Sequence, residues 1–135
     1  MLALPLTSTC CHYALLDSGI HELTFTVASR AAVDELVVHM NAIYDRTPPR
    51  GVARVLVQHC NVGMQPVTYM FQRMREWHAR RPVHFSSRAA ILVDDTILAW
   101  LVDSLLKTIL RTAAVEIRYF DSSDREAAIR WLLLE

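Results

Sequence analysis

The feature that most constrains the fold is the order in which apolar runs and amphipathic stretches follow one another. Two apolar runs, residues 12–16 and 21–27, flank the turn signal Asp17-Ser18-Gly19, and together they predict a β-hairpin. Apolar and polar residues alternate in the second run, which is typical of a strand with one buried face. The chain therefore begins with two antiparallel strands.

Strands and helices alternate through the rest of the chain. Apolar runs at 54–59, 89–93 and 115–120 predict three further strands, each followed by an amphipathic stretch. Strands joined through helices require right-handed crossovers and hence a parallel sheet, whereas the hairpin turn is too short for a crossover. We therefore predict an α/β fold with a five-stranded, mostly parallel sheet, an antiparallel N-terminal strand and four helices. We expect one domain spanning 1–135, with residues 1–10 as a loose tail.

Capping residues mark where the helices begin. Ser29 is predicted to cap the first helix, with Asp34 and Glu35 in its first turns, where the helix dipole favours acids. Pro66 suits the first turn of the second helix. Ser123 and Glu126 match a capping box at the start of the last helix. The strand at 54–59 has a continuous apolar centre, which predicts burial on both faces.

Composition excludes several classes of protein. The 135 residues are 53% hydrophobic and carry 14 basic and 14 acidic side chains, so the chain is globular and lacks the basic surplus of a nucleic-acid-binding protein. The longest apolar stretch, 89–102, is interrupted by two aspartates and is too short to span a membrane. Three cysteines, Cys10, Cys11 and Cys60, fit free thiols in a reducing compartment, so we expect a cytoplasmic protein.

Recognised catalytic and cofactor motifs are absent from the sequence. The chain has only three glycines, and it contains no phosphate-binding loop, no Gly-x-Ser-x-Gly and no Cys-x-x-Cys. No two of its six histidines have the i, i+4 spacing of a helical zinc site. We therefore expect no cofactor, no metal and no enzymatic activity. An enzyme using His59, Cys60 or Asp94 remains an alternative without a recognised constellation.

Two strand ends carry the candidate site residues. Asn61, Val62, Gly63, Met64 and Gln65 lead from a central strand into the second helix, whose free backbone N–H groups favour anions. Met64 precedes the helix and is expected to be exposed, which suits contact with a partner. Asp94 and Asp95 end another strand and either contact a ligand or serve as first-turn helix acids.

A broad apolar face on the predicted third helix, residues 97–110, supports a second hypothesis. We expect such a face either to cover a pocket for a small apolar ligand or lipid between the sheet and the helices, or to form a homodimer interface. The sequence leaves these alternatives open.

The closing segment of the chain resembles a known family. Residues 115–121, Val-Glu-Ile-Arg-Tyr-Phe-Asp, and 126–132, Glu-Ala-Ala-Ile-Arg-Trp-Leu, are similar to the last strand and helix of the SpoIIAA-like branch of the STAS superfamily (sulfate transporter and anti-sigma-factor antagonist). Residues 88–95 resemble an apolar strand of that branch running into polar residues. With the element order, the resemblance covers roughly residues 13–133.

The resemblance implies a β-α superhelix and a non-enzymatic interaction module. Antagonists of this family bind a kinase or an anti-sigma factor, and phosphorylation of a Ser or Thr at the start of the second helix switches binding off. The matching place is residues 61–68, where the loop lacks Ser and Thr68 falls inside the predicted helix. We therefore expect a regulatory module that binds a protein partner through Asn61–Gln65 without the usual phosphorylatable Ser.

Overall fold

The computed structural model describes residues 10–59, 62–81, 85–94 and 115–134. The strands are β1 (Cys11–Leu15), β2 (His21–Phe25), β3 (Val52–His59), β4 (Ser86–Val93) and β5 (Val115–Asp121). The described helices are α1 (Arg30–Arg46), α2 (Val67–Arg80) and α4 (Arg125–Leu132).

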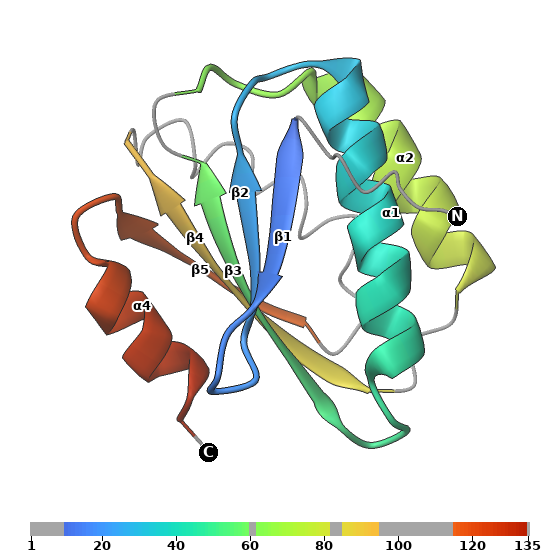
Figure 1. The fold of residues 1–135 in the computed structure, drawn as a ribbon. Helices are drawn as coiled ribbons and strands as arrows, with labels where there is room; N and C mark the ends of the chain where they lie inside the picture. The colour runs from blue at the N-terminus through green and yellow to red at the C-terminus, as the bar shows by residue number, and fades with distance from the viewer. Residues whose placement is uncertain (1–9, 60–61, 82–84, 95–114, 135) are drawn as a thin grey trace, which may run out of the picture.

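The sheet has the predicted number of strands and the predicted strand directions, and the structure adds their order. Its five strands lie in the order β1-β2-β3-β4-β5, with β1 antiparallel to β2 and every other pair parallel (Figure 1). The predicted hairpin and the mixed sheet are therefore confirmed. The described residues contain three of the four predicted helices, and the remaining one, expected between β4 and β5, lies outside them.

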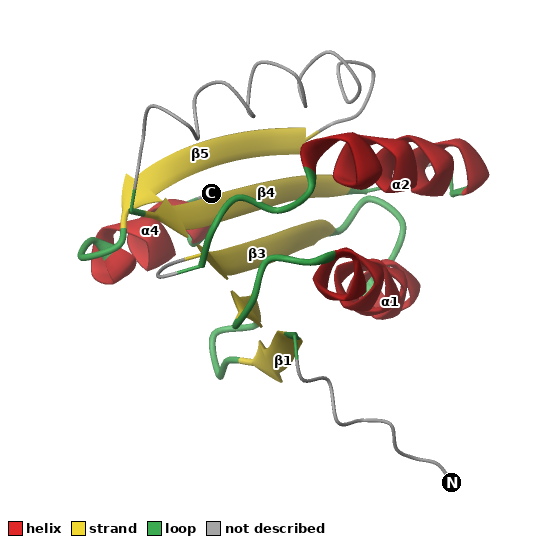
Figure 2. Cartoon of the chain, turned by 90° about the horizontal axis from the view of Figure 1, so that it is seen from above, coloured by secondary structure: helices red, strands yellow, loops and turns green. Residues whose placement is uncertain are grey.

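The helices lie on both faces of the sheet. Helices α1 and α2 lie side by side over one face, and α4 covers the other (Figures 1 and 2). Neighbouring residues of a strand point to opposite faces, so each strand contributes to two cores. On the α4 side, Leu56, Ala90 and Leu92 pack against Ala128 and Leu132.

The core under α1 contains larger aromatic groups. Leu23 and Phe25 of β2 pack against Ala32 and Ile43 of α1. Phe85, which precedes β4, belongs to the same core. No described helix is long and apolar enough to cross a bilayer.

The N-termini of α1 and α2 confirm one predicted cap and correct the position of one proline. The Ser29 side chain accepts from the Ala32 N–H at 3.1 Å, as predicted. Asp34 and Glu35 lie in the second turn of α1, and both side chains form tertiary contacts. Pro66 is the N-cap of α2 rather than a residue of its first turn.

The predicted capping box at the last helix is wrong. The N-cap of α4 is Asp124, which makes no side-chain capping bond. Ser123 instead donates through its N–H and its hydroxyl to the Asp121 carboxylate, at 3.0 and 2.5 Å. The Ser123 side chain therefore bonds to the carboxylate at the end of β5 and does not cap the helix.

Candidate binding site

A cavity of about 380 Å³ lies between the sheet and the two helices α1 and α2. From the sheet, the residues that line it are mainly aliphatic: Val55, Val57, Ala89, Ile91, Val115 and Ile117. From α2, they are Val67, Met70, Phe71, Met74 and Trp77. Each group occupies one face of its element, because the strand residues alternate and the helix residues recur at three- and four-residue spacing.

The cavity corrects the prediction that β3 is buried on both faces. Leu56, which faces α4, is fully buried, whereas its neighbours Val55 and Val57 are only partly buried. The same alternation holds in β4, where Ala90 and Leu92 are buried and Ile91 is partly buried. The face toward α2 is thus apolar but not fully packed.

Sequence reasoning did not assign α2 to the site. The apolar stripe of an amphipathic helix ordinarily packs in the core, yet Met74 is the only buried residue of α2. The stripe alone cannot distinguish the two roles, because a helix packed on a sheet and a helix facing a cavity need the same periodicity. The concentration of methionines in the stripe was the available signal, since flexible Met side chains suit irregular spaces.

Gln65 fixes the polar end of the cavity. It is 4% exposed, and its Oε1 accepts from the Ser29 N–H at 3.1 Å, while its Nε2 donates to the Val27 carbonyl at 2.9 Å. Since these bonds fix the orientation of the amide, its second N–H points to His59 Nε2, 3.3 Å away. His59 Nε2 therefore accepts, and the ring is neutral with its proton on Nδ1.

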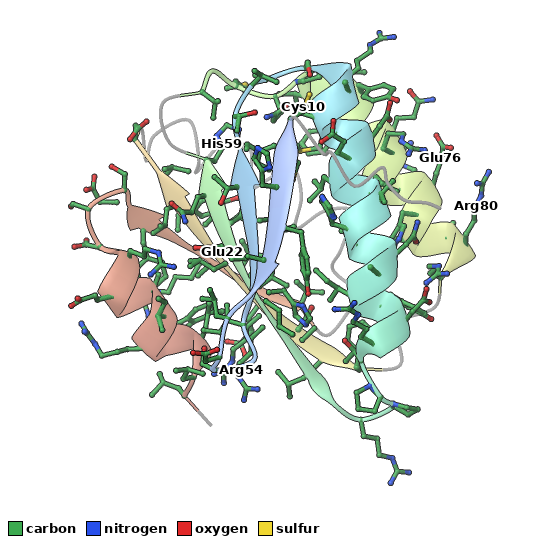
Figure 3. The ribbon with its side chains drawn as sticks, viewed as in Figure 1. Cys10, Glu22, Arg54, His59, Glu76 and Arg80 are labelled. Atoms are coloured by element: carbon green, nitrogen blue, oxygen red, sulfur yellow. The ribbon has the colours of Figure 1, made fainter. Side chains whose placement is uncertain are left out.

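Burial agrees with a neutral His59. Desolvation lowers the pKa of His59 from its usual value, although a hydrogen bond to its own backbone and the charge of Asp94 act in the opposite direction. The ring also packs edge-on against Phe25, with centroids 5.4 Å apart. His59 lies at the end of β3, at the same end of the sheet as Cys10 (Figure 3).

The loop predicted to bind a partner divides into inward and outward residues. Met64 is 45% exposed and Gly63 is also exposed, whereas Gln65 is buried and Val62 packs against the core. Asn61 lies outside the described residues. The exposed part of the described loop is thus Gly63 and Met64, and Gln65 anchors it to α1 and β3.

The structure describes one of the two aspartates that were predicted as site residues. Asp94 follows β4 and is among the residues that line the cavity. Asp95 lies outside the described residues. Asp94 therefore belongs to the same end of the cavity as His59 and Gln65.

The cysteines were further candidate groups. Burial, with the nearby Glu35 and Cys10, raises the pKa of the Cys11 thiol to about 12, so it stays protonated at neutral pH. Within the described ranges, no three His, Cys, Asp or Glu side chains lie close enough to hold a metal ion. Cys60 lies outside them.

The family model described as SpoIIAA-like matches residues 24–133. The chain belongs to the SpoIIAA-like family. The match extends from β2 through α4 and includes the loop before α2 and the strands that line the cavity. No curated protein and no solved structure matches the chain. Membership of the family suggests a regulatory module of the anti-sigma-factor-antagonist type.

Proposed function

We propose that this SpoIIAA-like protein is a non-catalytic cytoplasmic module that binds a protein partner, of the kinase or anti-sigma-factor type, through the loop 61–65. The observation that carries the proposal is Met64, a large apolar side chain that is 45% exposed at the place where antagonists of the family carry their switch. An exposed methionine on a rigidly anchored loop suits contact with a protein surface.

The proposed module lacks the usual phosphoswitch. The loop has no Ser, and Thr68 is the second residue of α2. We propose that binding at this loop is controlled by something other than phosphorylation at the helix start.

Replacing the exposed methionine tests the partner surface. Met64→Arg should abolish capture of the partner from native lysate, because a charge replaces the apolar contact at the centre of the proposed surface. Val38→Arg is the matched control, since Val38 is 63% exposed on α1, outside the loop. If Met64→Arg and the parent protein capture the same proteins, the loop is not the contact surface.

A second candidate function is binding of a small apolar ligand in the cavity. Its volume of about 380 Å³ is within the range of roughly 300–1,000 Å³ that ligand pockets occupy. Smaller apolar cavities, of about 150 Å³, already take up apolar molecules instead of water.

Native mass spectrometry of the purified protein tests the second candidate. A retained small-molecule mass that disappears on organic extraction supports a ligand. The ligand-binding function is contradicted if the purified protein has the mass of the bare monomer and also takes up none of the apolar compounds that are added. A clean dimer mass supports instead the homodimer alternative.

A further inference from the structure

We propose that the cavity takes an uncharged molecule with a long apolar chain, such as a long-chain alcohol or an isoprenoid, in preference to an anionic lipid. The proposal rests on the second candidate function and specifies its ligand. It follows from the length of the cavity, the composition of its walls and the placement of the charges around it.

The cavity is long in the direction of the strands. Its lining includes Ala53 and His59, which lie six residues apart in β3, and Ser87 and Asp94 in and after β4. Six residues of a strand extend about 20 Å. A flexible chain fits such a shape better than a compact ring system does.

The walls suit an alkyl chain. Four methionines line the cavity, with aliphatic strand residues opposite them: Met40, Met64, Met70 and Met74. Unbranched thioether side chains adapt to a chain that itself has many conformations. Burial of methylene groups, at roughly 0.8 kcal/mol each, supplies the affinity.

The described lining contains one arginine, and its guanidinium is directed away from the cavity. Arg88 is among the lining residues, but its guanidinium donates to the carbonyls of Trp131 and Leu134 at the end of α4. Its Nε also lies 3.6 Å from the Glu116 carboxylate. The Arg88 charge is therefore engaged on the opposite face of the sheet.

At the polar end of the cavity, the described lining offers an anion no cationic partner; His78, the other histidine of the lining, lies in the last turn of α2. At the polar end, Asp94 is a carboxylate, and His59 is held neutral by the Gln65 amide. A carboxylate or phosphate buried there would lose its hydration and lie near the negative charge of Asp94. An uncharged head group avoids both costs.

Dodecan-1-ol and dodecanoate distinguish the two ligand classes, because they share a chain and differ in head-group charge. Binding to the extracted protein at pH 7.5 is followed by native mass spectrometry and by intrinsic tryptophan fluorescence, to which Trp77 in the cavity lining contributes. We expect dodecan-1-ol to bind at least about tenfold more tightly than dodecanoate.

A cavity-filling variant locates the bound molecule. Ala89→Phe places a ring in the cavity and should weaken binding of dodecan-1-ol at least about tenfold, whereas Val38→Phe, the matched control on the exposed face of α1, should leave it unchanged. Val57→Phe is the second variant if Ala89→Phe does not fold, as judged by its melting temperature.

The outcomes separate the proposal from the functions on which it depends. Equal or tighter binding of dodecanoate overturns the uncharged ligand but keeps the cavity as a ligand site, and it would indicate that the amides at the start of α2 bind an anion. Binding of neither compound overturns both. Dodecan-1-ol binding that survives Ala89→Phe and Val57→Phe overturns the assigned location. The ligand measurements need no partner protein. Because Met64 also lines the cavity, partner capture by Met64→Arg is compared with that by Ala89→Phe, which changes the cavity and not the loop.

Discussion

At the scale of single residues, Glu35 shows how a helix side chain fixes the edge of the sheet. Its Oε1 accepts from the backbone N–H groups of Cys10 and Cys11, both at 3.0 Å. One turn later on α1, His39 Nε2 lies 2.8 Å from the Cys11 carbonyl. Together these two side chains hold the start of β1 against α1.

Glu35→Gln should lower the free energy of unfolding by about 1–3 kcal/mol, because two charge-assisted bonds are weakened. Glu76→Gln, on α2, is the matched control and should change it by less than about 0.5 kcal/mol. Urea denaturation measures both. Equal stability of the two variants would contradict the role of Glu35.

The effect of Glu35→Gln should also depend on pH. Burial raises the pKa of Glu35, but the hydrogen bonds from Cys11 and Cys10 outweigh it and leave the pKa below its usual value. A lowered carboxyl pKa stabilises the fold above the unfolded pKa of about 4.3, and this stabilisation is lost as the pH falls through the folded value. The difference between variant and parent protein should therefore shrink in acid.

Two histidines, one buried and one partly buried, give a second pH dependence, which arises from a base kept neutral rather than from an acid kept ionised. Burial lowers the pKa of His59, and burial with the charge of Arg46 lowers that of His21, which lies 2.7 Å from the Tyr13 hydroxyl. The unfolded chain takes up these protons first. Stability should therefore decrease as the pH falls below about 6.5.

Urea denaturation between pH 8 and pH 5 checks this dependence. His59→Leu should make it shallower, whereas replacing the exposed His12 by Gln should not. An unchanged slope in His59→Leu would show that the His59 ring is not kept neutral by the fold.

At the scale of elements, two arginine contacts anchor the last helix to the sheet. Arg54 Nε donates to the Leu132 carbonyl at 2.7 Å, at the C-terminus of α4, where the helix dipole favours a cation. Arg125, at the other end of α4, pairs with Glu22 at 2.7 Å. Contacts from β3 and β2 thus hold both ends of the helix.

Arg54→Met keeps the aliphatic stem and removes the hydrogen bond, and it should destabilise the protein by about 1–2 kcal/mol. Amide exchange in α4 should accelerate, while exchange in α1 should not. Arg80→Met on the exposed end of α2 is the control (Figure 3). Equal protection of α4 in both variants would contradict the anchoring role.

At the scale of the whole molecule, the two faces of the sheet differ in how tightly they are packed. Adjacent residues of β4 report on it, since Leu92 is 1% exposed in the α4 core and Ile91 lines the cavity. Leu92→Ala should cost about 3 kcal/mol, because it opens a void in a packed core. Ile91→Ala should cost clearly less, since its side chain already borders empty space.

Thermal and urea unfolding of the two variants measure the difference. Equal losses would mean that the α2 face is packed as tightly as the α4 face, which would argue against a ligand cavity. An added apolar ligand should raise the melting temperature of the parent protein more than that of Ile91→Ala, which has lost part of the contact surface.

The sequence by itself determined the strands of the sheet. Turn chemistry at Asp17-Ser18-Gly19 and the alternation of apolar runs with helices predict the number of strands and their directions, because hairpins are local and helical crossovers join parallel strands. The order β1-β2-β3-β4-β5 comes from the tertiary structure. The sequence also determined the Ser29 cap, since a capping bond spans only a few residues.

Only the tertiary structure decided the candidate site. The roles of Glu35 and Gln65 depend on partners that are distant in the chain and that the sequence pattern does not identify. The inward turn of Gln65, within a loop otherwise expected to face a partner, comes from bonds to residues 36 and 38 positions away. The cavity depends on how far α2 stands from the sheet, and periodicity gives the face of a helix but not its distance.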